Sequence, residues 1–88
     1  MLGRARAYKR LLTDAQGKVS PVAEPVLRDL ARFCCATKPT IRMRPDGGGI
    51  DPIAMGVAEG RREVFNRIGA MLGLDQHQVQ RLSETQDE

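Results

Sequence analysis

The longest helical pattern in the sequence runs from Asp51 to Gly73, DPIAMGVAEGRREVFNRIGAMLG. Asp51 is a suitable N-cap, and Pro52 suits the first helical position because its missing N–H would have no intrahelical partner there. Gly73 is placed to end the helix in a left-handed conformation. At about 100° per residue, one broad face of this helix is apolar. Its members are Ile53, Ala54, Val57, Ala58, Val64, Phe65, Ile68, Met71 and Leu72.

Arg61 interrupts this pattern, because it falls near the middle of the apolar arc. Its neighbour Arg62 is expected on the solvated face with Glu59 and Glu63. A guanidinium in the apolar arc needs a carboxylate, backbone carbonyls at a helix C-terminus, or a partner protein. The candidate carboxylates are Asp29, as the first choice, Asp14 and Asp51. The adjacent Gly60 predicts close approach of another backbone, because glycine inside a helix costs about 1 kcal/mol relative to alanine.

Two weaker helical patterns precede this stretch. The first covers about residues 2–15 and ends at Gly17. Residues 18–24 are expected to form a linker, because Pro25 would break a helix that began at Ser20. The second helix is therefore predicted to begin at Pro25. Its expected inner face consists of Val26, Leu27, Leu30, Ala31, Phe33 and Cys34.

The remaining segments complete the prediction. Residues 41–44 alternate apolar and basic side chains, which is typical of a short extended piece. The Gly-rich segment 45–49 is expected to be a flexible loop. Asp75 and Gln78 have the spacing of a capping box for a last helix that runs to about Ser83, before TQDE frays. The fold class is therefore all-α, a small domain of three to four helices with a long third helix at about 52–72.

The length of 88 residues indicates a single domain over residues 1–88. The chain has no CxxC motif and only one histidine, so no zinc site is expected. We expect Cys34 to be a small hydrophobic residue of the core rather than a nucleophile. No group of residues has the arrangement of catalytic machinery. We therefore expect a protein that is not an enzyme, with no cofactor, no small-molecule substrate and no membrane span.

Charge is divided unevenly along the chain. Residues 1–44 hold ten Lys/Arg and three Asp/Glu, a net charge of +7, and residues 45–88 hold four and eight, a net charge of −4, which together give the overall +3. Such a dipolar chain is suited to association with copies of itself, with an acidic protein surface or with nucleic acid through its basic half. The expected basic patch consists of Arg4, Arg6, Lys9 and Arg10.

Four sequence segments, AYKRLL, VLRDLARF, DP and AEGRREVFNRIGAML, occur in this order. In this arrangement the chain resembles a family of small helical proteins encoded among the virion structural genes of tailed bacteriophages. The resemblance covers about residues 7–72 and is most specific at Glu59, Gly60, Arg61 and Arg62. The chain differs from the family pattern at two places. The segment VSPVAEP looks inserted, and PDGGG lengthens the second loop. The resemblance implies an α-helical, non-enzymatic component of the virion and does not say which part of the particle it occupies. Our own expectation is a structural protein that binds a larger virion protein near the portal, tail or ejection apparatus, after assembly in the host cytoplasm.

A second interpretation is a DNA-binding helix-turn-helix over residues 65–84. Ile68, Gly69, Leu72, Gly73, Leu74, Val79 and Leu82 match that pattern. Exposed groups of the last helix would then face the major groove: Gln76, His77, Gln78, Gln80 and Arg81. The net charge of −2 over residues 65–88, which hold Arg67 and Arg81 against four acids, opposes binding to phosphates.

Overall fold

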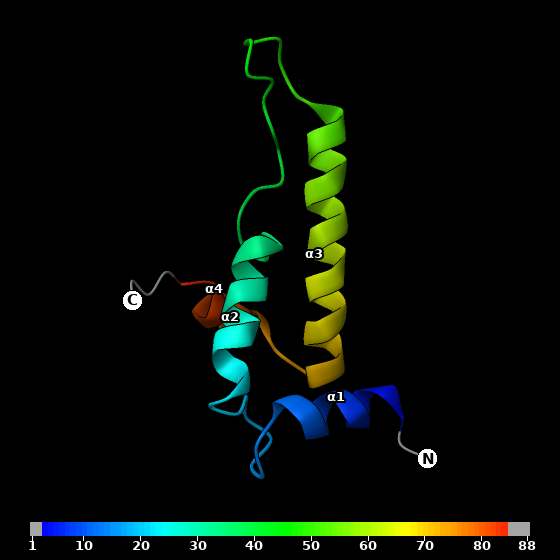
Figure 1. Cartoon of the computed structure of the whole chain (residues 1–88), viewed down its shortest axis with the longest axis vertical. Coiled ribbons are helices and arrows are strands. Elements are labelled where there is room, and N and C mark those ends of the chain that lie inside the picture. The colour runs from blue at the N-terminus through cyan, green and yellow to red at the C-terminus, as the bar shows by residue number, and fades with distance from the viewer. Residues whose placement is uncertain (1–2, 85–88) are drawn as a thin grey trace.

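The computed structural model describes residues 3–84. Four helices make up more than half of these residues: α1 (Arg4–Leu12), α2 (Ala23–Phe33), α3 (Pro52–Leu72) and α4 (Gln76–Ser83). The all-α class is therefore confirmed, and α3 is the longest helix. The molecule is elongated, with extents of 51 × 33 × 18 Å. α3 lies along the long axis, α1 crosses its lower end, and α2 lies beside it (Figure 1).

The ends of α3 are those that its sequence predicts. The carboxylate of Asp51 accepts hydrogen bonds from the N–H groups of Ile53 and Ala54, at 3.1 and 3.0 Å. At the other end Gly73 has φ 69° and ψ 30°, and the N–H of Leu74 donates to the carbonyl of Gly69. This is the hydrogen-bonding pattern of a Schellman motif. The helix continues through Gly60 without a break.

The capping box of α4 is also confirmed. The N–H of Gln78 donates to Asp75 Oδ1 at 2.8 Å, and the Gln78 side-chain oxygen accepts from the Asp75 N–H at 2.9 Å. The helix ends at Ser83 as expected. The predicted fraying of TQDE concerns residues outside the described part of the chain, as does the predicted start of the first helix at Leu2.

α1 ends earlier than predicted, at Leu12 rather than near Ala15. The reason is Asp14, whose Oδ1 accepts hydrogen bonds from the N–H groups of Gln16 and Lys18, both at 2.9 Å. An Asp side chain that bonds its own following backbone offers an alternative to the helix and favours a turn. Asp14 is therefore used in this turn rather than in an ion pair with Arg61.

α2 begins earlier than predicted, at Ala23 rather than Pro25. Pro25 is the third residue of the helix, where a backbone N–H has no intrahelical partner, so its ring does not break the hydrogen-bond ladder. Ser20 supports this start, because its Oγ accepts from the N–H of Ala23 at 3.2 Å. The assignment of all of residues 18–24 to a linker was therefore wrong.

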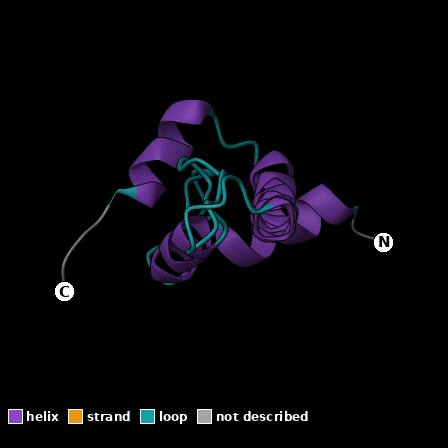
Figure 2. Cartoon of the chain, turned by 90° about the horizontal axis from the view of Figure 1, so that it is seen from above, coloured by secondary structure: helices purple, strands orange, loops and turns teal. Residues whose placement is uncertain are grey.

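The core lies in the half of the molecule where the helices meet. Phe65 and Leu27 are its largest fully buried side chains. Around them are Ala31, Cys34, Leu72 and Leu82, with partly buried Tyr8, Leu12, Val19, Leu30, Ile68, Leu74 and Val79. Cys34 is a buried core residue, as expected, whereas Val26 and Phe33 of the expected inner face of α2 are exposed. Seen along α3, helices α2 and α4 lie to one side of it, whereas α1 crosses its lower end and extends to the other side (Figure 2).

Candidate functional site

The segment Glu59-Gly60-Arg61-Arg62 lies in the middle of α3, beside the chain that leaves α2. Arg62 is half-buried and binds this chain through its backbone. Its Nε and Nη2 atoms donate to the carbonyl oxygen of Cys35 at 3.0 and 2.9 Å, and Nη2 also donates to the carbonyl oxygen of Lys38. These carbonyls follow the C-terminus of α2, where a cation is favoured. The expectation that Arg62 faces solvent was wrong.

Glu59 binds the same segment after α2 at Thr40. The hydroxyl of Thr40 donates to Glu59 Oε1, and Thr40 is only 6% exposed. Glu59 and Arg62 do not form an ion pair with each other, since the Arg62 guanidinium donates to backbone carbonyls. Within residues 3–84 the structure contains one ion pair, between Arg28 and Glu24. We name Glu59, Arg62 and the groups that they bind on Cys35, Lys38 and Thr40 the clamp.

Arg61 is exposed and lies with its guanidinium carbon 4.4 Å from the centre of the Phe33 ring. This is a cation–π contact. The expected ion pair with Asp29 is absent from the described residues. The physical reason is that the Arg61 guanidinium stays in water, so no buried charge requires a carboxylate. Its role as a contact with another protein stays a prediction.

Gly60 does not serve close packing within the chain. A Cβ atom placed there would meet no atom within 4 Å outside its own local backbone, and the same is true of Gly56. The expected close approach of another backbone was therefore wrong for the described residues. Both positions lie open on the exposed side of α3.

The apolar arc of α3 is wider than its neighbours can cover. Ala58, Phe65, Gly69 and Leu72 are buried. Their positions lie about 100–160° around the helix from Ile53. At the other edge of the arc, Ile53, Val57 and Val64 are 80%, 49% and 56% exposed. With Gly60 they lie within about 40° of Ile53, and we name these four residues the exposed strip.

A hairpin extends the apolar surface beyond the core. Residues 41–51 double back, with Met43 bridged to Ile50 and the Asp51 N–H donating to the carbonyl of Arg42 at 2.7 Å. The predicted extended piece is therefore confirmed, and the Gly-rich loop at 45–49 forms the tip, at the top of Figure 1. Ile41, Met43 and Ile50 are each more than half exposed. The clamp binds the base of this hairpin to α3.

These features can be compared with known proteins. A family model described as "Bbp19-like phage protein" matches residues 8–84. The chain belongs to the Bbp19-like phage protein family. The match contains all of the clamp, the exposed strip and the hairpin, and it runs through both segments in which the chain looked longer than its relatives. No curated protein and no solved structure matches the chain.

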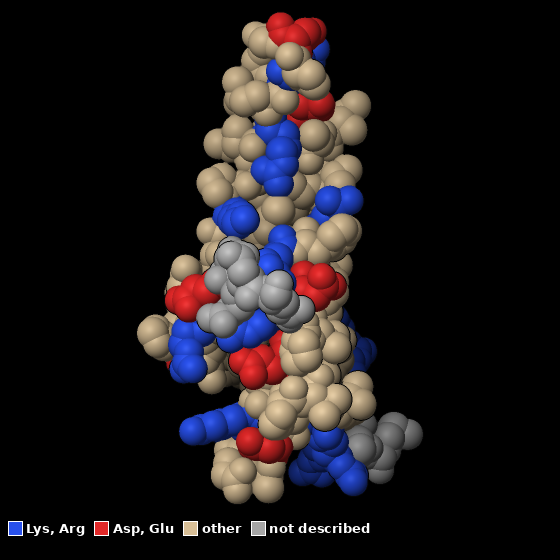
Figure 3. All heavy atoms as spheres, turned by 60° about the vertical axis from the view of Figure 1, so that its left-hand side comes forward, with Lys and Arg blue, Asp and Glu red and all other residues tan. Residues whose placement is uncertain are grey.

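In this Bbp19-like protein the basic patch lies on α1. Arg4, Arg6, Lys9 and Arg10 are all exposed, as predicted, and the first turn of the helix contains no acidic residue. Figure 3 shows Lys and Arg side chains at the lower end of the molecule, where α1 lies. This end is opposite the tip of the hairpin (Figure 1).

The residues of the helix-turn-helix interpretation form two helices joined at Gly73, as that motif requires. Of the side chains assigned to the groove, Gln76, His77, Gln80 and Arg81 are exposed. Gln78 is instead used in the capping box with Asp75. None of the helices formed by residues 3–84 combines the length and apolar character needed to cross a bilayer.

Proposed function

We propose that this Bbp19-like protein is a non-enzymatic structural component of a tailed-phage virion, where it binds a larger virion protein near the portal, tail or ejection apparatus. The observation that carries the proposal is the exposed strip on α3. Its apolar side chains, and those of the hairpin that leads into α3, are all about half exposed or more. Exposed apolar surface of this kind is typical of protein–protein contacts.

The clamp supports the same proposal. Glu59 and Arg62 are charged residues in the middle of α3, and both bind the segment that follows α2. Glu59 accepts from the Thr40 hydroxyl, and Arg62 donates to the carbonyl oxygen of Cys35. They therefore have a structural use. The clamp binds the base of the hairpin to α3, so the hairpin and the exposed strip are already fixed relative to each other in the free protein. This lowers the entropy cost of binding a partner.

A helix of the larger virion protein is the occupant that best suits the strip. Gly60 within the strip and Gly56 at its border have no side chains, so the backbone of another helix can come close there. Arg61, stacked on Phe33 beside the strip, provides a cation and an aromatic ring at its border. Arginine and aromatic side chains are enriched among the residues that dominate binding energy.

The test is incorporation into particles. Phage carrying Val57→Asn or Val64→Asn is grown, particles are purified, and the chain is quantified by mass spectrometry against the major capsid protein. We expect both substitutions to lower incorporation several-fold while the melting temperature of the isolated chain is unchanged. Val22→Asn is the matched control, because Val22 is 85% exposed outside the strip. Absence of the parent chain from purified particles would overturn the virion proposal.

The helix-turn-helix interpretation predicts a different outcome. Duplex DNA would shift on a gel in a salt-dependent way, and Arg81→Ala would abolish the shift. A shift that survives Arg81→Ala and is lost when α1 is neutralised would instead assign nucleic-acid contact to the basic patch.

A further inference from the structure

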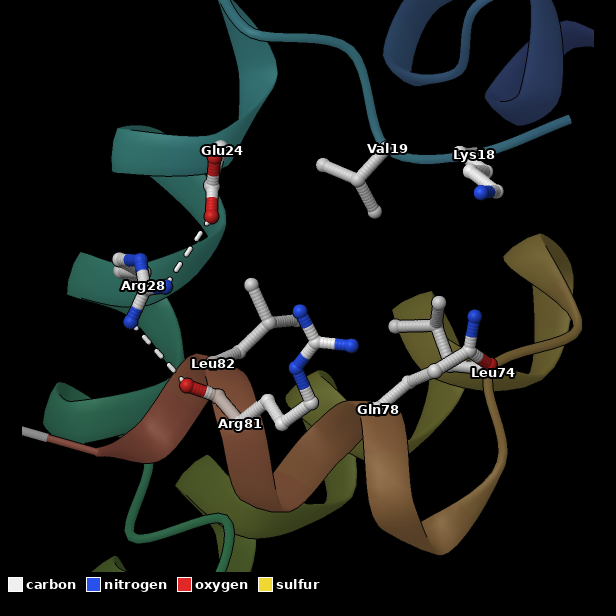
Figure 4. Close-up of a pocket in the computed structure, with 8 residues that line it drawn as sticks. All are labelled: Lys18, Val19, Glu24, Arg28, Leu74, Gln78, Arg81 and Leu82. Carbon is white, nitrogen blue, oxygen red and sulfur yellow. Dashed lines mark hydrogen bonds and ion pairs between the residues drawn. The ribbon is translucent and has the colours of Figure 1, made fainter. Parts of the chain in front are cut away.

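A hollow lies on a part of the molecule that neither the exposed strip nor the hairpin reaches. It has a volume of about 320 Å³ and is formed where the turn before α2, α2 itself, the connection from α3 to α4, and α4 meet. Its lining consists of Lys18, Val19, Glu24, Arg28, Leu74, Gln78, Arg81 and Leu82 (Figure 4). This volume is at the lower end of the range for ligand sites in proteins.

The apolar part of the lining is small. Val19 and Leu74 are half-buried and Leu82 is buried in the core. The three side chains come from different parts of the chain and are drawn around the same space in Figure 4. They provide room for one aliphatic side chain rather than for a large aromatic ligand.

The polar part of the lining consists mostly of hydrogen-bond donors. The guanidinium of Arg81 extends into the hollow, and Lys18 lies across from it (Figure 4). Within residues 3–84 the Arg81 guanidinium donates no hydrogen bond. Gln78 accepts from Asp75 through its side-chain oxygen, which leaves its amide nitrogen on the side of Lys18. The ligand must therefore supply acceptors.

The carboxylate of Glu24 does not satisfy these donors. It forms an ion pair with Arg28 at 3.0 Å, and the other terminal nitrogen of Arg28 donates to the carbonyl oxygen of Arg81 at 3.1 Å. Arg28 and Glu24 thus neutralise each other in the wall of the hollow. The positive charges of Lys18 and Arg81 remain, and an anionic group is the complement to them.

A long polyanion is a poor match for this place. α4, which carries Arg81, is bordered by the exposed carboxylates of Asp75 and Glu84. A nucleic-acid backbone that reached Arg81 would also approach these like charges, which lowers its affinity. One or two carboxylates on a short segment avoid this repulsion.

We propose that the hollow binds an acidic segment of a partner protein in which an aliphatic side chain stands next to a carboxylate. The aliphatic group packs on Val19, Leu74 and Leu82. The carboxylate accepts from Arg81 and Lys18. This inference goes beyond the proposed virion contact and uses other residues, so that substitutions in the exposed strip leave it intact.

The probe is an acetylated, amidated tetrapeptide of alternating leucine and aspartate, titrated into the isotopically labelled full chain and followed by NMR. We expect amide signals of Val19, Leu74 and Leu82 to shift. The corresponding leucine–asparagine peptide should bind roughly tenfold more weakly, because it lacks the charge that strengthens the hydrogen bonds. Arg81→Gln and Lys18→Gln should each weaken the acidic peptide several-fold. The matched control is Arg67→Gln on the exposed side of α3, which should bind like the parent.

Three results would overturn the proposal. The two peptides could bind equally, which would remove the role of the carboxylate. Inorganic phosphate could shift the same signals with the affinity of the acidic peptide, which would remove the role of the aliphatic side chain. The acidic peptide could leave all signals unchanged at millimolar concentration. Because this measurement needs no virion protein, its failure and the failure of the virion proposal are distinguishable.

Discussion

Arg62 donates two hydrogen bonds to the carbonyl oxygen of Cys35, a residue whose φ of 53° lies in the left-handed region. A residue with a Cβ atom adopts this conformation at a cost of roughly 1–2 kcal/mol. The guanidinium of a residue 27 positions away in the sequence thus fixes the backbone where α2 ends and the hairpin connection begins. The neighbouring Arg61 lies outside, against Phe33.

This relationship predicts unequal effects of the two arginines on stability. Arg62→Ala removes hydrogen bonds from a charged donor and should lower the free energy of unfolding by about 1.5–3 kcal/mol. Arg61→Ala removes an exposed cation–π contact and should cost about 0.5–1 kcal/mol. Urea unfolding of both variants measures the difference. Equal losses, or a larger loss for Arg61→Ala, would contradict the assignment of the clamp.

Glu59 and Thr40 provide a second test of the clamp. Glu59→Ala leaves the buried hydroxyl of Thr40 without its acceptor and should destabilise the protein by about 1–3 kcal/mol. Glu63→Ala is the matched control on the same helix, because Glu63 is exposed, and should change stability by less than about 0.5 kcal/mol. In a double-mutant cycle with Thr40→Val, the two losses should not add. Full additivity would mean that the two side chains do not interact.

Cys34 and Cys35 should differ in reactivity although they are adjacent. Cys34 is buried in the core, whereas Cys35 is half-buried beside Arg42, whose Nη2 lies 3.1 Å from its sulfur. Iodoacetamide added to the native protein should therefore modify Cys35 first, as peptide mass spectrometry would show. Faster modification of Cys34 would contradict its place in the core.

Burial, and then the nearby Cys35 thiol, raise the pKa of Cys34 above its ordinary value of 9.0. At high pH the unfolded chain loses this proton more readily than the folded chain does. Ionisation therefore favours unfolding, and the contribution of Cys34 to stability falls as the pH rises through 9.0 and above. Urea unfolding near neutrality and at about pH 10 should show a larger loss for the parent than for Cys34→Ala, which removes this titration. An identical loss in both would contradict the prediction.

The basic patch predicts salt-sensitive association. Its four cations are exposed on α1, so their attraction to an acidic partner surface or to DNA is screened as ionic strength rises. Replacement of Arg4, Arg6, Lys9 and Arg10 by glutamine should weaken assembly at low salt and reduce its dependence on salt. Assembly of the parent that is unchanged from low to above physiological ionic strength would contradict this role.

The sequence by itself determined the helical class, the bounds of α3 and the capping box of α4. These features depend on groups a few residues apart, such as Asp51 with Ile53 and Ala54, or Gly73 with Gly69. Local hydrogen bonds and local φ values do not require knowledge of the rest of the fold. The early end of α1 is also local in origin, since it depends on the turn that Asp14 makes.

Only the tertiary structure decided which edge of the wide apolar arc on α3 is buried. Periodicity gives the width of the arc but not where the other helices touch it. The helices pack on the edge that contains Phe65 and Leu72 and leave Ile53 and Val64 exposed. As a result, the centre of the buried face of α3 lies away from Arg61, and Arg62 lies against the carbonyl of Cys35. The groups that bind Glu59 and Arg62 lie 19 to 27 residues away in the sequence, and helical spacing carries no information about such contacts.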